Sequence, residues 1–86
     1  MILRYKTQGT CSRQILLELD GTTVKSVAFE GGCHGNLQGI AKLCRDRDAN
    51  ELIDTLKGIR CGFKATSCPD QLAKALEKAL QQAQEQ

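Results

Sequence analysis

Cysteines are the residues of this 86-residue chain with the most chemistry to offer, because a thiolate can bind a metal or exchange with a disulfide. The chain has five of them. An odd number cannot pair completely within one chain, so the disulfide framework of a small secreted domain is a poor match. One cysteine, Cys44, falls on the apolar stripe of a predicted helix, and we expect it to be a small buried core residue.

The other four cysteines, Cys11, Cys33, Cys61 and Cys68, lie at joints between predicted elements, where side chains and amides are free to build a site. If the helices pack side by side on a sheet, the later three joints converge at one end of the domain. Cys68 begins a helix, and Cys61 is flanked by lysine and arginine. Both settings favour a thiolate, so we expect depressed pKa values for these two thiols.

Three thiolates and one further ligand suit tetrahedral zinc. We therefore expect Cys33, Cys61 and Cys68 to hold zinc or an iron–sulfur cluster, with Cys11 or His34 as the fourth ligand. The competing hypothesis is thiol redox, in which two of these cysteines, such as Cys61 and Cys68, cycle through a disulfide. We expect no catalytic residues and no independent enzyme, because the chain has neither a serine–histidine–acid set nor a carboxylate pair.

The segment before the first predicted helix offers a different kind of site. Gly31, Gly32 and Gly35 let the backbone approach an anion, and Asn36 would cap the helix whose N-terminus binds it. A phosphate of a nucleotide or flavin could bind there. The alternative is a tight turn that needs positive φ.

The elements that position these residues are predicted from hydrophobic periodicity. Alternation predicts strands over residues 2–7, 14–19 and 22–29, with Asp20-Gly21 in a tight hairpin turn. The helical spacing of apolar residues then predicts three helices. Their expected N-caps are Asn36, Asp48 and either Ser67 or Cys68. The expected fold is one α+β domain over residues 1–86, a three-stranded antiparallel meander followed by three helices packed on one face of the sheet.

Two of these helices carry further end signals. In the second, Asp48 and Glu51 form a capping box, and Gly58 stops the helix. In the third, Pro69 lies in the first turn and the apolar stripe extends to Ala83. The polar residues 81–86 are expected to fray.

Composition narrows the function classes. The net charge of +2 and the three aromatic residues argue against nucleic-acid binding. Arg4 and Lys6 interrupt the apolar N-terminus, so we expect a cytoplasmic protein with no signal peptide and no membrane segment. A three-stranded sheet covered on one face also suggests a homodimer, in which the second copy covers the open face.

Three segments together resemble a known family. They are Gly31-Gly32-Cys33-His34-Gly35-Asn36-Leu37, Gly58-Ile59-Arg60-Cys61-Gly62 and Ala65-Thr66-Ser67-Cys68-Pro69-Asp70-Gln71-Leu72-Ala73. The chain is similar to the TSCPD-domain family over nearly its whole length. The family includes small stand-alone proteins and domains at the C-terminus of adenosylcobalamin-dependent ribonucleotide reductases. This resemblance implies a role accessory to ribonucleotide reductase or another redox protein, because 86 residues cannot form the reductase barrel.

The order of elements also resembles the iron–sulfur scaffolds of the NifU/IscU type. On this resemblance Cys33, Cys61 and Cys68 would match the three scaffold cysteines. The chain departs from the scaffold pattern at two positions. Gly35 stands where the scaffolds have an acidic residue, and Ser67 stands where they have a histidine.

Overall fold

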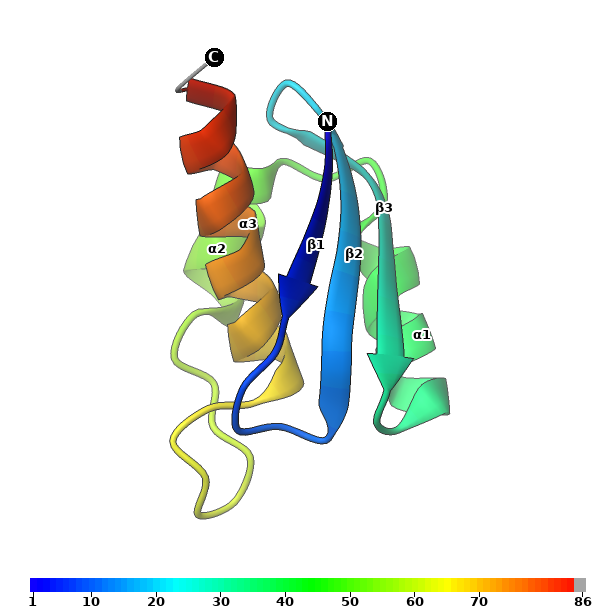
Figure 1. Cartoon of the computed structure of the whole chain (residues 1–86), viewed down its shortest axis with the longest axis vertical. Coiled ribbons are helices and arrows are strands. Elements are labelled where there is room, and N and C mark those ends of the chain that lie inside the picture. The colour runs from blue at the N-terminus through cyan, green and yellow to red at the C-terminus, as the bar shows by residue number, and fades with distance from the viewer. Residues whose placement is uncertain (85–86) are drawn as a thin grey trace.

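The structure of the protein is a computed structural model that describes residues 1–84. It confirms the expected α+β arrangement of three strands followed by three helices (Figure 1). The elements in chain order are β1 (Ile2–Lys6), β2 (Ser12–Asp20), β3 (Thr23–Gly31), α1 (His34–Cys44), α2 (Ala49–Leu56) and α3 (Cys68–Gln84). In the described part of the chain, no helix is both long enough and apolar enough to cross a membrane.

The strands form an antiparallel meander in the order β1-β2-β3. Gly21, in the turn between β2 and β3, has a φ of +60°, which a glycine adopts without a steric penalty. The inward positions of the strands stack across the sheet in matched rows. Two such rows are Leu3–Leu17–Val27 and Tyr5–Ile15–Phe29. These rows supply the sheet's share of the hydrophobic core.

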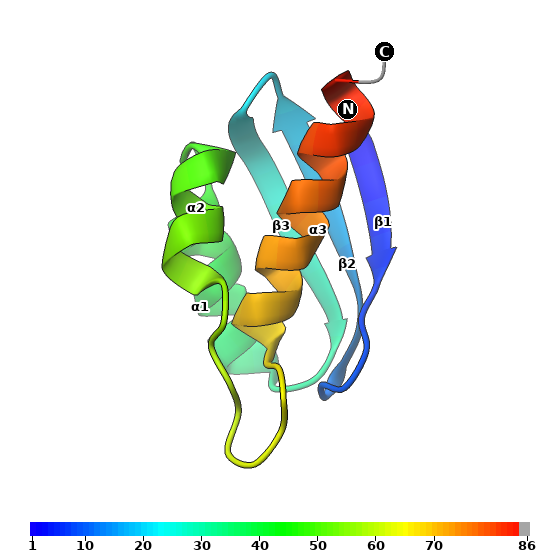
Figure 2. The ribbon, with the colours of Figure 1, turned by 90° about the vertical axis from the view of Figure 1, so that its left-hand side faces the viewer.

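All three helices lie on one face of the sheet (Figure 2), as the sequence predicts. The long helix α3 crosses the sheet and packs against both β2 and α2, while α1 packs along β3. The stripe of α3 that faces the core is fully buried at four positions, Leu72, Ala75, Leu76 and Ala79. The predicted stripe is wrong at Ala83, which is exposed. Residues 81–84 are helical rather than frayed, and the rest of the predicted frayed end, residues 85–86, lies outside the described residues.

The N-cap of helix α1 lies three residues before the one that the sequence predicts. Its N-cap is Cys33 rather than Asn36, and the Leu37 N–H donates to the Cys33 carbonyl at 3.0 Å as the first helical bond. Gly31 and Gly32 cause the difference, because both adopt positive φ and turn the chain into the helix at once. No side chain caps this end, so Asn36 has no capping role.

The caps predicted for the other two helices are confirmed. The Asp48 side chain accepts a hydrogen bond from the Glu51 N–H at 3.2 Å and caps α2. After α2, Gly58 has a φ of +86°. Ser67 caps α3, since its Oγ accepts from the Asp70 N–H at 3.1 Å.

Candidate functional site

The joints that carry the four candidate cysteines meet at one end of the domain. Figure 1 shows this end at the bottom, where the β1–β2 loop, the β3–α1 joint, the α2–α3 loop and the start of α3 lie together. The antiparallel meander causes the convergence. It sends β1 and β3 toward the same end, and α1 and α3 both begin there.

Two of these cysteines are in contact. The Sγ atoms of Cys11 and Cys68 are 3.8 Å apart, although the residues are 57 positions apart in the sequence. The Ser12 Oγ lies 3.3 Å from the Cys68 Sγ on the buried side, and the Thr10 Oγ1 is 3.1 Å from the Ser12 Oγ. Cys68 is only 7% exposed, whereas Cys11 is exposed to solvent. The pair therefore has one protected sulfur and one accessible sulfur.

The surroundings of Cys68 favour its thiolate. Burial raises the pKa of the Cys68 thiol, but hydrogen bonds from Ser12, Thr10 and Cys11 act in the opposite direction and lower it overall. The predicted depression of the Cys68 pKa is thus confirmed. Its main cause is the set of hydroxyls on the facing β1–β2 loop, which the sequence analysis missed. The adjacent small polar residues Thr10 and Ser12 around Cys11 were the available signal.

Cys68 is flanked by polar residues that fasten the α2–α3 loop. The Asp70 carboxylate, buried with its residue 4% exposed, accepts from the Gly58 N–H at 2.7 Å and from the Thr66 hydroxyl. The Ser67 hydroxyl donates to the Ile59 carbonyl at 2.6 Å. These bonds hold both ends of the loop that carries Cys61.

A second set of contacts ties the β3–α1 joint to the thiol pair. Gly32 has a φ of +78°, and a Cβ placed on it would lie 2.8 Å from Leu37 Cδ1 and 3.1 Å from Cys11 Sγ. No side chain fits in that space. Close packing at Gly32 therefore places the β3–α1 joint against Cys11.

The remaining candidates are accessible. Cys33, His34 and Cys61 are all exposed, and His34 is the first residue of α1. Within residues 1–84, no three or more His, Cys, Asp or Glu side chains are grouped closely enough to hold a metal ion. The structure thus assembles the Cys11–Cys68 pair and leaves Cys33 and Cys61 on neighbouring joints.

A family model decides the relationship. The TSCPD domain model matches residues 3–80. The chain belongs to the TSCPD-domain family. No curated protein and no solved structure matches it, so the resemblance to NifU/IscU-type scaffolds stays a prediction.

Cys44 of this TSCPD domain is a core residue, as the sequence predicts. It is 2% exposed and belongs to the main hydrophobic cluster. Burial raises the pKa of its thiol, against a smaller opposite effect of the Arg47 charge. A neutral thiol suits a packing role.

The glycine-rich segment of the TSCPD domain combines a turn with an open helix start. Gly31 and Gly32 make the positive-φ turn, which is the alternative that the sequence left open. Gly35 and Asn36 lie in the first turn of α1 and are exposed, with open space around Gly35. A phosphate at this segment stays a prediction.

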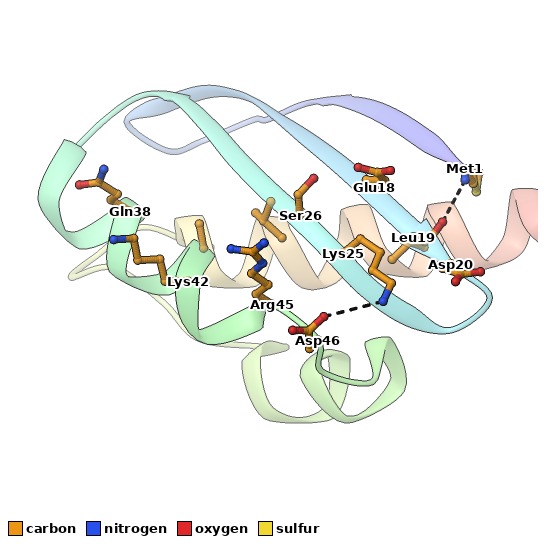
Figure 3. A pocket seen from close by; sticks show the side chains of 12 residues that line it. Met1, Glu18, Leu19, Asp20, Lys25, Ser26, Gln38, Lys42, Arg45 and Asp46 are labelled. Atoms are coloured by element: carbon orange, nitrogen blue, oxygen red, sulfur yellow. Dashed lines mark hydrogen bonds and ion pairs between the residues drawn. The ribbon is translucent and has the colours of Figure 1, made fainter.

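An open groove of about 1,020 Å³ on the domain has no cysteine among its lining residues (Figure 3). The groove runs along β3 and α1. Charges of both signs line it, and Lys25 and Asp46 form an ion pair of 3.8 Å beside it. Because these charges largely compensate one another, the groove shows no preference for a charged ligand.

Proposed function

We propose that this TSCPD domain is a binding module whose four joint cysteines, Cys11, Cys33, Cys61 and Cys68, bind a single zinc ion. The observation that carries the proposal is the 3.8 Å separation of the Cys11 and Cys68 sulfurs. Two thiolates at about 2.3 Å from one tetrahedral zinc ion are also about 3.8 Å apart. The pair therefore fits half of a tetrahedral thiolate site.

The chemistry of the donor set supports the same function. The lowered pKa of Cys68 favours the form that binds metal, and the Ser12 hydroxyl at 3.3 Å would orient that sulfur from outside the first shell of ligands. Cys11, which contacts Cys68, is a better fourth ligand than His34 at the exposed start of α1. Cys33 and Cys61 would supply the remaining two sulfurs.

A zinc ion with four thiolate ligands has no open position, so it would act as a structural cross-link between the segments that carry the four cysteines rather than as a catalyst. A module that is stabilised by zinc and carries out no reaction of its own would serve as an accessory domain to a partner enzyme. Ribonucleotide reductase, the partner that the family resemblance implies, is the first candidate to test.

Metal analysis of protein purified without oxygen tests the proposal. We expect about one zinc ion per chain, as in tetrahedral structural sites. Cys11→Ser and Cys68→Ser should each lose the zinc, while Cys44→Ala, a substitution in the core, should retain it. Metal-free wild-type protein, or zinc retained in Cys68→Ser, would contradict the proposal. If the purified protein instead contains about one equivalent of iron, the proposed metal is iron rather than zinc.

Thiol redox is the second candidate, and the contact between Cys11 and Cys68 favours it too. In this reaction both thiols lose their protons, a sulfur–sulfur bond forms between them, and the two electrons reduce a partner disulfide to two thiols. The structure places Cys11, rather than Cys61, in contact with Cys68. Metal-free protein that loses two hydrogens on mild oxidation, with the bond mapped to Cys11 and Cys68, would establish this function instead.

A further inference from the structure

The sheet face opposite the helices carries an ordered pattern of outward side chains. The strand registers place them in three rows, namely Lys6–Gln14–Glu30, Arg4–Leu16–Ala28 and Ile2–Glu18–Ser26. None of these residues is buried. Figure 2 shows all three helices on the other side of the sheet, so within the described chain no helix covers this face.

Apolar residues lie in two adjacent rows of this open face. Leu16, at the centre of the central strand, is 40% exposed, and Ile2 on β1 is 69% exposed. Ala28 lies beside Leu16 on β3 and is also exposed. The solvated face of an antiparallel sheet is normally polar, so leucine at its centre indicates a covered face.

Charge differs between the two edges of the open face. Outward residues of β1 include Arg4 and Lys6, which are basic, while β3 carries the acidic Glu30. Strand β3 also carries Lys25, a basic residue that pairs with Asp46 after α1.

The Glu30 carboxylate accepts an exposed hydrogen bond from the Gln14 side chain with one oxygen, and its other oxygen lies 3.7 Å from Arg13. Both Arg13 and Glu30 are more than half exposed, and such a surface pair contributes little. Glu30 is therefore available to a second cation.

We propose that this face binds the same face of a second copy of the chain, around a two-fold axis that runs along β2. This rotation lays β1 of each copy over β3 of the other. Because Lys6 and Glu30 share a row, each Lys6 then faces Glu30 of the second copy, and the two Leu16 side chains meet near the axis. The two Leu16 side chains are thus buried against each other, and both pairs of opposite charge lie in the neighbouring row.

The charges select this axis over the other two-fold arrangement of the same face. An axis across the strands would lay β1 over β1 and bring Arg4 against its own copy, with no pairing of opposite charges. Along β2, the unfavourable contacts are those of Glu18 and Asp20, each with its own copy, since both are exposed acidic residues of the central strand. Glu18 meets its own copy only when the axis runs along β2, so a substitution at Glu18 distinguishes the two arrangements.

The face is small, because neighbouring strands are only about 4.8 Å apart and the shared rows span only a few residues of each. A standard interface buries about 800 Å² on each partner, and this face offers less. We therefore expect a reversible dimer with a dissociation constant in the micromolar range. The zinc proposal concerns the end of the domain, so either proposal can fail without the other.

Sedimentation velocity of wild-type protein over a series from micromolar to millimolar concentration tests the dimer. We expect a concentration-dependent monomer–dimer equilibrium that Leu16→Asp abolishes. Leu43→Asp is the matched control, because Leu43 is 71% exposed on α1 and lies outside this face. Far-UV circular dichroism verifies that each variant is folded. A wild-type monomer at every concentration, or a dimer unaffected by Leu16→Asp, would overturn the proposal.

Substitutions that exchange the charges of Lys6 and Glu30 test whether the two-fold axis runs along β2. Lys6→Glu and Glu30→Lys should each weaken the dimer by about tenfold, because each creates two like-charge contacts. The double variant restores both pairs and should recover dimerisation. Glu18→Gln should strengthen the dimer, since it removes one of the repulsions at the axis. Failure of the double variant to recover, or a weaker dimer with Glu18→Gln, would refute this arrangement of the two copies.

Discussion

Replacement of Asp70 by asparagine should destabilise the domain, although the side chains have nearly the same shape. The Asp70 carboxylate accepts two hydrogen bonds, from the Gly58 N–H at 2.7 Å and from the Thr66 hydroxyl, and Lys74 lies 3.6 Å away. An asparagine keeps one acceptor oxygen, so the charged bond to the Thr66 hydroxyl and the attraction to Lys74 are lost.

Loss of a hydrogen bond to a buried charged group costs about 1.5–3 kcal/mol. We therefore expect Asp70→Asn to lower the free energy of unfolding by about 2 kcal/mol. For a domain of this size that loss corresponds to a melting temperature lower by about 10 °C. Urea unfolding followed by far-UV circular dichroism measures it, with Asp54→Asn, an exposed position on α2, as the control.

The pH dependence gives a second readout. The Thr66 hydroxyl bond is the main cause that lowers the pKa of Asp70, with contributions from the Gly58 N–H and Lys74 that outweigh the effect of burial. A depressed pKa means that the carboxylate stabilises the fold fully above its unfolded pKa of about 3.9. This contribution is lost as the pH falls through the lower folded value. The difference between wild type and Asp70→Asn should therefore be constant near neutral pH and shrink below about pH 4.

Two results would refute this reasoning about Asp70. One is a free energy of unfolding within about 0.5 kcal/mol of wild type at neutral pH, which is the range of ordinary surface substitutions. The other is a wild-type advantage that persists unchanged in acid, because a protonated Asp70 should behave like the asparagine.

Three further substitutions test the site and the core. Gly32→Ala should cost about 2–4 kcal/mol, from positive φ and overpacking together; urea unfolding should show a clearly smaller loss for Gly21→Ala, where φ is also positive but a Cβ meets nothing within 4 Å. Ser12→Ala removes a hydrogen bond from the Cys68 thiol, so the pH profile of Cys68 alkylation, read by mass spectrometry, should shift upward. Leu76→Ala should cost about 2–5 kcal/mol in the same unfolding assay.

Local signals account for the parts of the fold that could be predicted. The Asp48 cap, the stop at Gly58 and the Ser67 cap each depend on a few neighbouring residues, and each is confirmed. The strand pattern is local too, since alternate residues of β2 such as Ile15 and Leu17 face the core. Such features are readable because the same short segment contains both the signal and its consequence.

The site could be predicted only in outline, because its contacts join distant segments. Cys61 and Cys68 are close in sequence, yet the partner of Cys68 is Cys11, 57 positions away. The start of α1 was misplaced for a related reason. Asn36 is a good cap by local preference, but the turn at Gly31 and Gly32, where Gly32 packs on Cys11, begins the helix earlier.

The geometry divides the Thr-Ser-Cys-Pro-Asp motif between two roles. Thr66, Ser67 and Asp70 are buried and hydrogen-bonded to one another or to the α2–α3 loop, so their polar groups are already used in holding that loop. Cys68 alone faces the other way, toward the β1–β2 loop and Cys11. A motif of this kind fastens one loop and presents one thiol. Among the described residues, the one thiol outside the motif that contacts Cys68 is that of Cys11, so the proposed zinc or disulfide chemistry depends on a pair that the motif supplies only in half.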